Sequence, residues 1–319
     1  FSIGNYGYIG TGYNATTATT YTDFYQYNSL TNIWTKKADF TGGARRRAAA
    51  FSIGAYGYMG TGYDDVTTFL DDFYQYDPTA DSWTKKTDFG GTARMDAAGF
   101  SIGNYGYIAT GNAGGFTYDL WQYDPSAGTW AEKDSLPLLL GNPRDNAACF
   151  VIGNYAYLGT GFDGVLMAPA SDFWRYDPSA NSWMQILDLQ GTARAAAVGF
   201  SIGGKGYIHG GWDINMMSPT YYDDLWELSP PLGINEADAG SMVSVYPNPT
   251  SSTIQVISNQ YSVRGLEIYN VMGEKVFQSP NSELRTHISL DLSSHPDGIY
   301  FITIKTDKEN IVEKLIINK

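Results

Sequence analysis

Four arginines recur at almost constant spacing and could bind an anion. Each lies six residues before a repeated phenylalanine, and the four are Arg45, Arg94, Arg144 and Arg194. A planar guanidinium donates two parallel hydrogen bonds to a carboxylate or a sulfate, so a ring of them around one axis could hold such a group. Alternatively, each arginine pairs with an aspartate of the repeat or stacks on an aromatic ring. Repetition in every unit favours this alternative, because a binding site seldom needs all copies.

Residues that break the repeat are better candidates for ligand contacts than residues that keep it. Those at the heads of the repeats are Arg46, Arg47, Asp96 and Asp145, and those in the long loops are Phe116, Trp212 and Tyr221. Aromatic and charged side chains on loops are typical of binding surfaces. We therefore expect any ligand to bind at these positions.

Candidates for catalysis and for metal binding are scarce. The chain has three histidines, His209, His287 and His295, and a single cysteine, Cys149, which reads as a small core residue. No repeated or clustered histidine ligand set can be built from them in the repeat region. His209 beside Gly210 reads as a structural polar residue. We name no catalytic residue, no metal ligand and no cofactor, and an enzymatic activity is uncertain and not the favoured interpretation.

The composition excludes two classes of partner. The formal net charge is −13 over 319 residues, and nothing resembles the basic stripe that neutralises phosphates, so we expect no nucleic acid partner. Anionic membrane surfaces are disfavoured for the same reason. No apolar run approaches 18 residues, which predicts a chain that does not span a membrane.

A regular period organises the first two thirds of the chain. Phe-Ser-Ile-Gly begins at Phe1, Phe51, Phe100 and Phe200, and the variant Phe-Val-Ile-Gly begins at Phe150. The intervals of 49 or 50 residues are typical of repeat architectures. Many tyrosines, tryptophans and glycines favour short strands joined by tight turns over helices.

One unit can be divided into four expected strands. Turn signals predict strands at 97–102, 105–109 and 118–123, a polar Gly-rich loop at 111–117, and a fourth strand that opens at Trp130. A unit of this size cannot bury both faces of its sheet alone. Neighbouring sheets must therefore stack, and radial repetition closes them into a propeller.

These units resemble Kelch repeats. The resemblance rests on the head arginine, Tyr-Gly-Tyr-Ile running into Gly-Thr-Gly or into Gly210-Gly211, and a tyrosine and a tryptophan at fixed spacing. It covers residues 1 to about 229 and implies an all-β fold, a β-propeller with five visible blades. Four copies depart from the usual double glycine, and the fifth copy stops after Leu228. We expect that the chain lacks its true N-terminus and that the native propeller has five or six blades, closed by strands from both termini.

A different pattern begins after a linker. Residues 230–242 are acidic and Pro/Gly-containing, which predicts a linker between a propeller at 1–229 and a domain at 243–319. Short alternating runs in the tail predict a small C-terminal β-sandwich. The predicted strands lie at 245–250, 253–257, 265–270, 271–276, 287–292, 298–302 and 314–319.

The tail resembles the C-terminal sorting domain of the type IX secretion system of Bacteroidota. The motifs are Tyr-Pro-Asn-Pro, Tyr-Asn-Val-Met-Gly, Gly-Ile-Tyr and a terminal lysine-containing strand. The sorting residues that the resemblance implies are Tyr246, Pro247, Asn248, Pro249, Gly273, Gly298, Tyr300, Lys314 and Lys319. It implies the type IX machinery as a partner, and a secreted or outer-surface location in a Gram-negative bacterium.

Two functions remain open from these patterns. The favoured one is a secreted or surface-displayed propeller that binds a glycan or a protein through its loops. The alternative is a carbohydrate-active enzyme that resembles bacterial sialate epimerases, with arginine binding a carboxylate and His209 or a glutamate acting as base.

Overall fold

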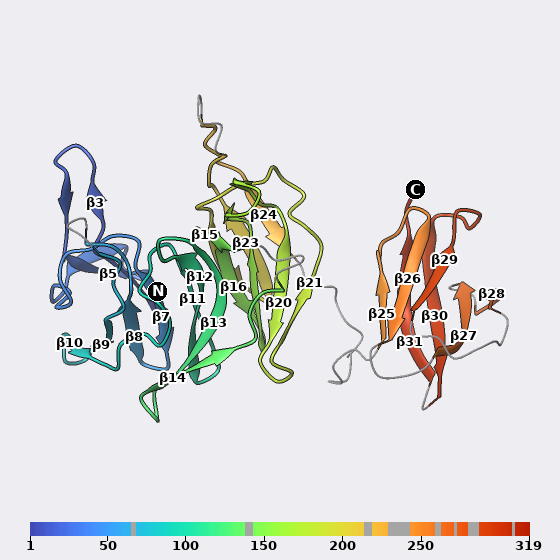
Figure 1. Cartoon of the computed structure of the whole chain (residues 1–319), viewed down its shortest axis with the longest axis horizontal. Helices are drawn as coiled ribbons and strands as arrows, with labels where there is room; N and C mark the ends of the chain where they lie inside the picture. The colour runs from blue at the N-terminus through green and yellow to red at the C-terminus, as the bar shows by residue number, and fades with distance from the viewer. Residues whose placement is uncertain are drawn as a thin grey trace. The chain divides into compact units, whose positions relative to one another are not determined.

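The computed structural model describes residues 1–64, 68–137, 143–213, 219–228, 243–258, 263–270, 273–279, 287–307 and 310–319 (Figure 1). All regular secondary structure in these ranges is β-strand. The expected all-β fold is therefore confirmed. The chain divides into two compact units, Phe1–Leu232 and Gly233–Lys319.

The first unit is a β-propeller of five antiparallel sheets, one for each repeat. The first sheet contains β1 (Ser2–Ile3), β2 (Tyr6–Gly10), β5 (Phe24–Asn28) and β6 (Ile33–Lys36). The second contains β7 (Ala49–Ile53), β8 (Tyr56–Gly60), β9 (Phe73–Asp77) and β10 (Ser82–Lys85). The core of the third is β11 (Ala98–Ile102), β12 (Tyr105–Asn112), β13 (Phe116–Asp124) and β14 (Thr129–Lys133).

The last two sheets differ in their number of strands. The fourth contains β16 (Ala148–Ile152), β17 (Tyr155–Gly159), β20 (Phe173–Asp177) and β21 (Ser182–Gln185). In the described part of the chain the fifth has three strands, β22 (Val198–Ile202), β23 (Lys205–His209) and β24 (Leu225–Leu228). This agrees with the interruption of the fifth copy after Leu228.

Further strands form at the end of the propeller where each inner strand begins, here called the mouth face. They are β3 (Tyr13–Asn14) with β4 (Thr19–Thr20), and β18 (Phe162–Asp163) with β19 (Ala168–Pro169). β15 (Arg144–Asp145) pairs with both β13 and β18, so the third sheet continues into a loop of the fourth repeat. In Figure 1 the labelled β3 and β15 both lie toward the upper edge of this unit.

The inner strands approach one another closely, which explains their small residues. A methyl group on Gly99 would lie 2.9 Å from the carbonyl oxygen of Ala50, on the inner strand of the preceding sheet. Gly199 approaches the backbone of Cys149 in the same way. Large rings lie one position further along and pack between sheets, where Phe51 and Phe100 are almost fully buried. Each such ring stabilises the fold by about 2 kcal/mol.

The expected strands lie close to the observed ones, with one local difference. The loop expected at 111–117 is shorter, because β12 runs to Asn112 and β13 starts at Phe116. A register shift between Ala109 and Gly111 brings these two ends together. The bulge allows the hairpin to extend past the Gly-rich segment.

The second unit is the expected small β-sandwich. One sheet contains β25 (Val243–Tyr246), β26 (Thr253–Ser258) and β29 (His287–Asp291). The other contains β28 (Lys275–Gln278), β27 (Val263–Asn270), β30 (Gly298–Thr306) and β31 (Asn310–Ile317). Alternate residues of both sheets form one core, which includes Ile254, Leu266, Ile302 and Leu315. The strand expected at 271–276 begins later, at Lys275, and residues 271–272 lie outside the described ranges.

Candidate functional site

The four repeat arginines are buried inside the sheets. Arg94 Nη1 and Nη2 donate to the two carboxylate oxygens of Asp119 at 2.5 and 2.7 Å, and Nη1 also donates to the carbonyl of Thr110 at 2.9 Å. The other three repeat this pattern, as Arg45 with Asp72, Arg144 with Asp172 and Arg194 with Asp224. Each arginine side chain is at most 1% exposed.

The arginine ring is thus no anion site at the channel. Each guanidinium already binds a carboxylate, and a buried pair of this kind is costly to separate. Hydrogen bonding from Arg194 lowers the pKa of Asp224 to about 2. The structure therefore corrects the idea that Arg45, Arg94, Arg144 and Arg194 face a ligand, and shows the alternative, a pairing with the repeat aspartate. Arg45 and Arg94 also lie over phenylalanine rings.

A second set of equivalent residues surrounds the entrance of the channel. Arg47, Asp96, Asn146 and Ala196 each lie four residues before the repeat phenylalanine, and each has φ between 53° and 60°. The backbone N–H of each of the last three donates to the carbonyl of the preceding member at 3.0–3.1 Å. This left-handed conformation is uncommon for residues other than glycine, and it often accompanies functional sites.

Three of these side chains, those of Arg47, Asp96 and Asn146, form what we call the polar centre. Arg47 Nη1 donates to Asp96 Oδ2 at 2.7 Å, and the Asp96 side chain is 6% exposed while that of Arg47 is 44% exposed. Asn146 donates to Asp145 Oδ1 at 3.0 Å, and Asn112 donates to its other oxygen at 3.3 Å. Burial, together with the negative charge of Asp145, raises the pKa of Asp96, although Arg47 opposes the shift.

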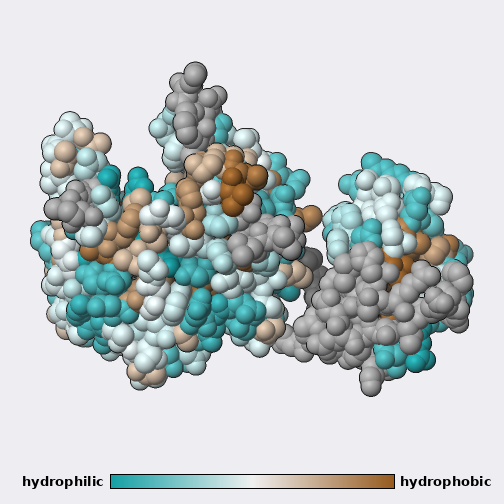
Figure 2. Space-filling model, viewed as in Figure 1, coloured by the Kyte–Doolittle hydropathy of each residue, from teal (hydrophilic) through white to brown (hydrophobic). Residues whose placement is uncertain are grey.

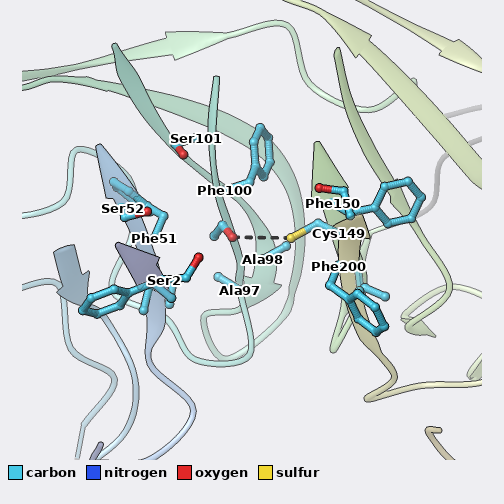
Figure 3. Close-up of a pocket in the computed structure, with 18 of the residues that line it drawn as sticks. Ser2, Phe51, Ser52, Ala97, Ala98, Phe100, Ser101, Cys149, Phe150 and Phe200 are labelled. Carbon is cyan, nitrogen blue, oxygen red and sulfur yellow. Dashed lines mark hydrogen bonds between the residues drawn. The ribbon is translucent and has the colours of Figure 1, made fainter. Parts of the chain in front are cut away.

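The polar centre lines a cavity of about 210 Å³ at the mouth. Four alanines, Ala48, Ala97, Ala147 and Ala197, are shared with a channel of about 610 Å³ between the inner strands. Figure 3 shows this channel with Ser2, Ser52 and Ser101 on its inner strands. The Cys149 thiol donates to the Gly99 carbonyl at 3.4 Å, and burial raises its pKa to about 12, which disfavours the thiolate.

Aromatic side chains lie on the loops of the mouth face, several of which pair with the heads of the inner strands, as Tyr63 with Arg46, Phe162 with Asp145 and Trp212 with Ala195. We call them the aromatic collar, and it consists of Tyr13, Tyr63, Phe116, Phe162, Trp212 and Tyr221. The Arg46 guanidinium lies between two of its rings, 4.4 Å from the centre of Tyr13 and 5.7 Å from that of Tyr63. Phe116 and Phe162 pack with centroids 5.5 Å apart, and Tyr221 is 76% exposed beside its backbone partner Trp212.

Exposed apolar residues extend the collar. Val165, Leu166 and Met167 lie in the turn between β18 and β19 and are each more than half exposed. Figure 2 shows hydrophobic side chains gathered along the upper edge of this unit. The mouth face therefore combines aromatic and apolar side chains with a small polar centre.

The seven candidates that break the repeat all lie on the mouth face. Arg46, Arg47, Asp96 and Asp145 lie at the heads of the inner strands, and Phe116, Trp212 and Tyr221 lie in the loops of the same face. Reasoning from sequence missed Tyr13, Tyr63, Asn112, Phe162 and Asn146. A signal was present for the first four, which directly follow Thr-Gly at the end of the second strand of their repeats.

His209 does not contribute to this cavity. It lies at the end of β23, where its Nδ1 is 3.1 Å from the backbone carbonyl of Asp224, and its side chain is exposed. The lining of the mouth cavity does not include it. Over the described ranges, no group of three or more His, Cys, Asp or Glu side chains could hold a metal ion.

Several motif residues of the second unit form hydrogen bonds with its last strand or beside it. Asn248 Oδ1 accepts a hydrogen bond from the backbone N–H of Ile316 at 2.8 Å, and Thr250 pairs in parallel with Ile317. Tyr300 donates to the Pro296 carbonyl, and Lys319 Nζ donates to that of Ser293 at 2.5 Å. Gly273 has φ of 80° in a turn. The side chain of Lys314 lies outside the described part of the chain.

One comparison with known proteins concerns the second unit of the chain. Residues 244–318 match the family model of the secretion system C-terminal sorting domain, so the chain carries a sorting domain for export. No helix among the described residues is long and apolar enough to cross a membrane. A curated relative, ulvan lyase NLR42 of Nonlabens ulvanivorans, is 28% identical over 95 residues. That match covers 29% of this chain and 17% of the relative, so the chain spans about a sixth of it.

A solved structure shares the fold. The structure of YjhT matches with a TM-score of 0.59 and 16% sequence identity, over 97% of this chain and 94% of that one. At this identity the likeness concerns the fold alone. It supports the assignment of the first unit as a β-propeller.

Proposed function

We propose that this chain is an exported glycan-binding protein whose ligand occupies the mouth face of a Kelch-type propeller. The observation that carries the proposal is the aromatic collar around the polar centre of Arg47, Asp96 and Asn146. Sugar rings present apolar faces and a rim of hydroxyl groups. Aromatic rings can pack against the former, while carboxylate, amide and guanidinium groups bind the latter.

Export rests on the second unit. A sorting domain of the type IX kind would direct the chain through that machinery to the outer surface of a Gram-negative bacterium, or into the medium. A relative that matches 95 residues is named an ulvan lyase. Both observations support an extracellular role on glycans, in a bacterium of the Bacteroidota type.

An enzyme resembling sialate epimerases is the weaker candidate. That reaction would need a free arginine for a carboxylate and a base beside it. The repeat arginines are occupied by aspartates, and His209 lies outside the mouth cavity. Glu227, one of the two glutamates in the propeller, binds Lys205 at 2.6 Å. We therefore favour binding over catalysis. The proposed binding role involves no cofactor.

A glycan array tests the proposal. The purified chain should bind a subset of polysaccharides, and Tyr63→Ala should weaken that binding at least tenfold by removing one ring of the collar. The matched control is Tyr56→Ala, because Tyr56 is a partly exposed tyrosine in the hairpin at the opposite end of its sheet. Equal binding by both variants would contradict the mouth as the site. Binding to no glycan on the array would favour a protein as the ligand.

A further inference from the structure

Within the described ranges, Arg47 is the exposed charged residue of the mouth cavity. Five of the eight lining residues are alanines, and the other three are Arg47, Asp96 and Asn146. The Arg47 side chain is 44% exposed, whereas that of Asp96 is 6% exposed. Asp145, which precedes Asn146, is buried as well. A ligand in this cavity therefore meets a cation, although the chain as a whole carries a net charge of −13.

The two buried carboxylates already accept hydrogen bonds from the protein. Asp96 Oδ2 accepts from Arg47 Nη1 at 2.7 Å. The two oxygens of Asp145 accept from Asn146 at 3.0 Å and from Asn112 at 3.3 Å. A sugar hydroxyl would have to displace one of these donors in order to reach either carboxylate. Recognition at this cavity therefore depends more on its donors than on its acceptors.

Arg47 keeps one edge of its guanidinium available for a ligand. Its Nη1 binds Asp96 and lies 3.8 Å from the sulfur of Met95. Among the described residues, Arg47 Nε and Nη2 have no hydrogen-bond partner. The N–H groups of this edge are parallel and match two oxygens of a carboxylate or a sulfate. Hydrogen bonds to such an anion are roughly twice as strong as those between neutral groups.

The surroundings of Arg47 hold this edge in place and add a second positive charge. The backbone of Arg47 has φ of 60°, and its carbonyl accepts from the Asp96 N–H at 3.1 Å. Arg46, the preceding residue, lies between the rings of Tyr13 and Tyr63. A donor that is already held in position loses less conformational entropy when a ligand binds. The head of the second sheet therefore presents a preorganised cationic edge.

The size of the cavity limits what it can hold. Its volume of about 210 Å³ equals that of roughly seven water molecules in the liquid. This leaves room for one sugar ring with one acidic substituent. The alanine methyl groups of the lining can pack against the apolar face of such a ring.

We propose that the mouth binds an acidic glycan, whose carboxylate or sulfate group accepts two hydrogen bonds from Nε and Nη2 of Arg47. This inference rests on the proposed function, because it names the class of glycan that the same site takes. Asp96 is a positioning residue, which holds the guanidinium through Nη1 and is itself shielded from the ligand.

Matched pairs of polysaccharides test the requirement for charge. Polygalacturonate is compared with its carboxyl-reduced form, and a sulfated galactan with its desulfated form, by titration at one ionic strength. At least one acidic member should bind at least tenfold more tightly than its neutral partner. A loss on carboxyl reduction identifies a carboxylate as the group recognised, and a loss on desulfation identifies a sulfate. Equal binding within each pair, or tighter binding of the neutral members, would overturn the proposal.

Three variants assign the charge preference to Arg47. In Arg47→Gln the ratio of the two Kd values within a pair should fall from at least ten to within about threefold of one. Arg47→Lys keeps the charge without the two-donor edge and should recover part of the ratio. Lys205→Ala removes the same charge from the opposite end of the propeller and should leave the ratio unchanged. A purely structural role of Arg47 would lower both affinities alike, and an unchanged ratio in Arg47→Gln would overturn the proposal.

The effect of Asp96→Asn has a sign that a structural role does not predict. The asparagine oxygen can still accept from Arg47 Nη1, while the negative charge beside the guanidinium is removed. Affinity for the acidic member should therefore rise severalfold. Weaker binding of that member by Asp96→Asn would contradict the account of Asp96.

Inorganic sulfate provides a test that uses no glycan. Millimolar sulfate, added at constant ionic strength, should shift the Nε–H resonance of Arg47 saturably, and Arg47→Gln identifies that resonance by its loss. An unchanged resonance would overturn the proposal. Glycan binding at the mouth without a preference for charge would refute this proposal alone. A sulfate shift without binding of any glycan would instead refute the proposed function and leave the anion site in place.

Discussion

At Arg94, two bonds to Asp119 and one to the Thr110 carbonyl occupy a guanidinium that is almost completely buried. The arginine thereby joins the head of the inner strand to the third strand of its own sheet, and to the bulged part of the second strand. The same three-way contact recurs in three other sheets. The regular spacing of the arginines is therefore explained by a contact that stabilises each of these sheets.

Removal of one arginine tests this structural role. Arg94→Ala leaves the mostly buried carboxylate of Asp119 without its partner and should lower the free energy of unfolding by about 3 kcal/mol. Urea denaturation measures the loss. Lys85→Ala is the control, because its pair with Asp88 is half exposed on both sides and should contribute less than about 0.5 kcal/mol. Similar losses in the two variants would contradict the account.

The threonine before the glycine that ends the second strand, in Gly60-Thr61-Gly62 and Ala109-Thr110-Gly111, offers a contrasting pair of substitutions. Thr61 and Thr110 both have φ near 60° and are fully buried. Thr61 Oγ1 accepts a hydrogen bond from the Ala49 N–H, whereas Thr110 Oγ1 has no partner among the described residues. Thr110→Gly should therefore stabilise the protein by about 1 kcal/mol, through relief of strain and of an unsatisfied hydroxyl.

Thr61→Gly should give a free energy of unfolding at least about 1 kcal/mol lower than Thr110→Gly does, because it also leaves the Ala49 N–H without its acceptor. Thermal unfolding of both variants gives the comparison. A gain at Thr61 as large as that at Thr110 would show that the hydroxyl bond is irrelevant.

Glu267 gives the second unit a dependence on pH. Hydrogen bonds from Lys275, Lys305 and Tyr269 lower its pKa to about 2. A depressed carboxyl pKa stabilises the fold above the ordinary value near 4.5, and that stabilisation is lost as pH falls from there to about 2. Amide exchange in β27 and β30 should accelerate over this range, and Glu267→Gln should flatten the dependence. An unchanged profile in that variant would contradict the assignment.

Among the elements, the repeat period predicted the strands well because each sheet buries the same residues in the same register. The mouth was harder to predict. Arg47, Asp96, Asn146 and Ala196 share one backbone conformation but no chemistry, so composition gives no signal of positive φ. For the arginine ring, the sequence favoured a pairing with the repeat aspartate but left an anion site open as well, because the partner aspartates lie 25–30 residues further along the chain. Their proximity follows from the pairing of strands, which the spacing alone left open.

The last strand is the element on which the second unit depends most. β31 pairs with β30 along its whole length, and it also receives Asn248 and Thr250. Deletion of residues 310–319 removes Leu315 and Ile317 from the core, so the sandwich should not fold. In the native bacterium the truncated chain should stay in the periplasm, and cell fractionation measures this. Normal appearance at the cell surface would contradict a sorting role.

For the whole molecule, the proposed function assigns binding to the first unit and export to the second. Among the described residues, the propeller and the sandwich have separate cores, since no core cluster contains residues of both units. The truncated chain, recovered from the periplasm, should therefore retain the glycan affinity of the intact chain within about twofold, whereas a large loss would place part of the site in the second unit.

The affinity of one mouth variant tests the central claim most directly. With the best glycan from the array, titration calorimetry should give a Kd for Arg47→Ala at least tenfold weaker than for the unmodified chain. A charged donor contributes about 1.5–3 kcal/mol to such a bond. Lys205→Ala, which removes an exposed cation from the opposite end of the propeller, should leave the Kd unchanged. Equal affinities for all three proteins would contradict a glycan site at the mouth.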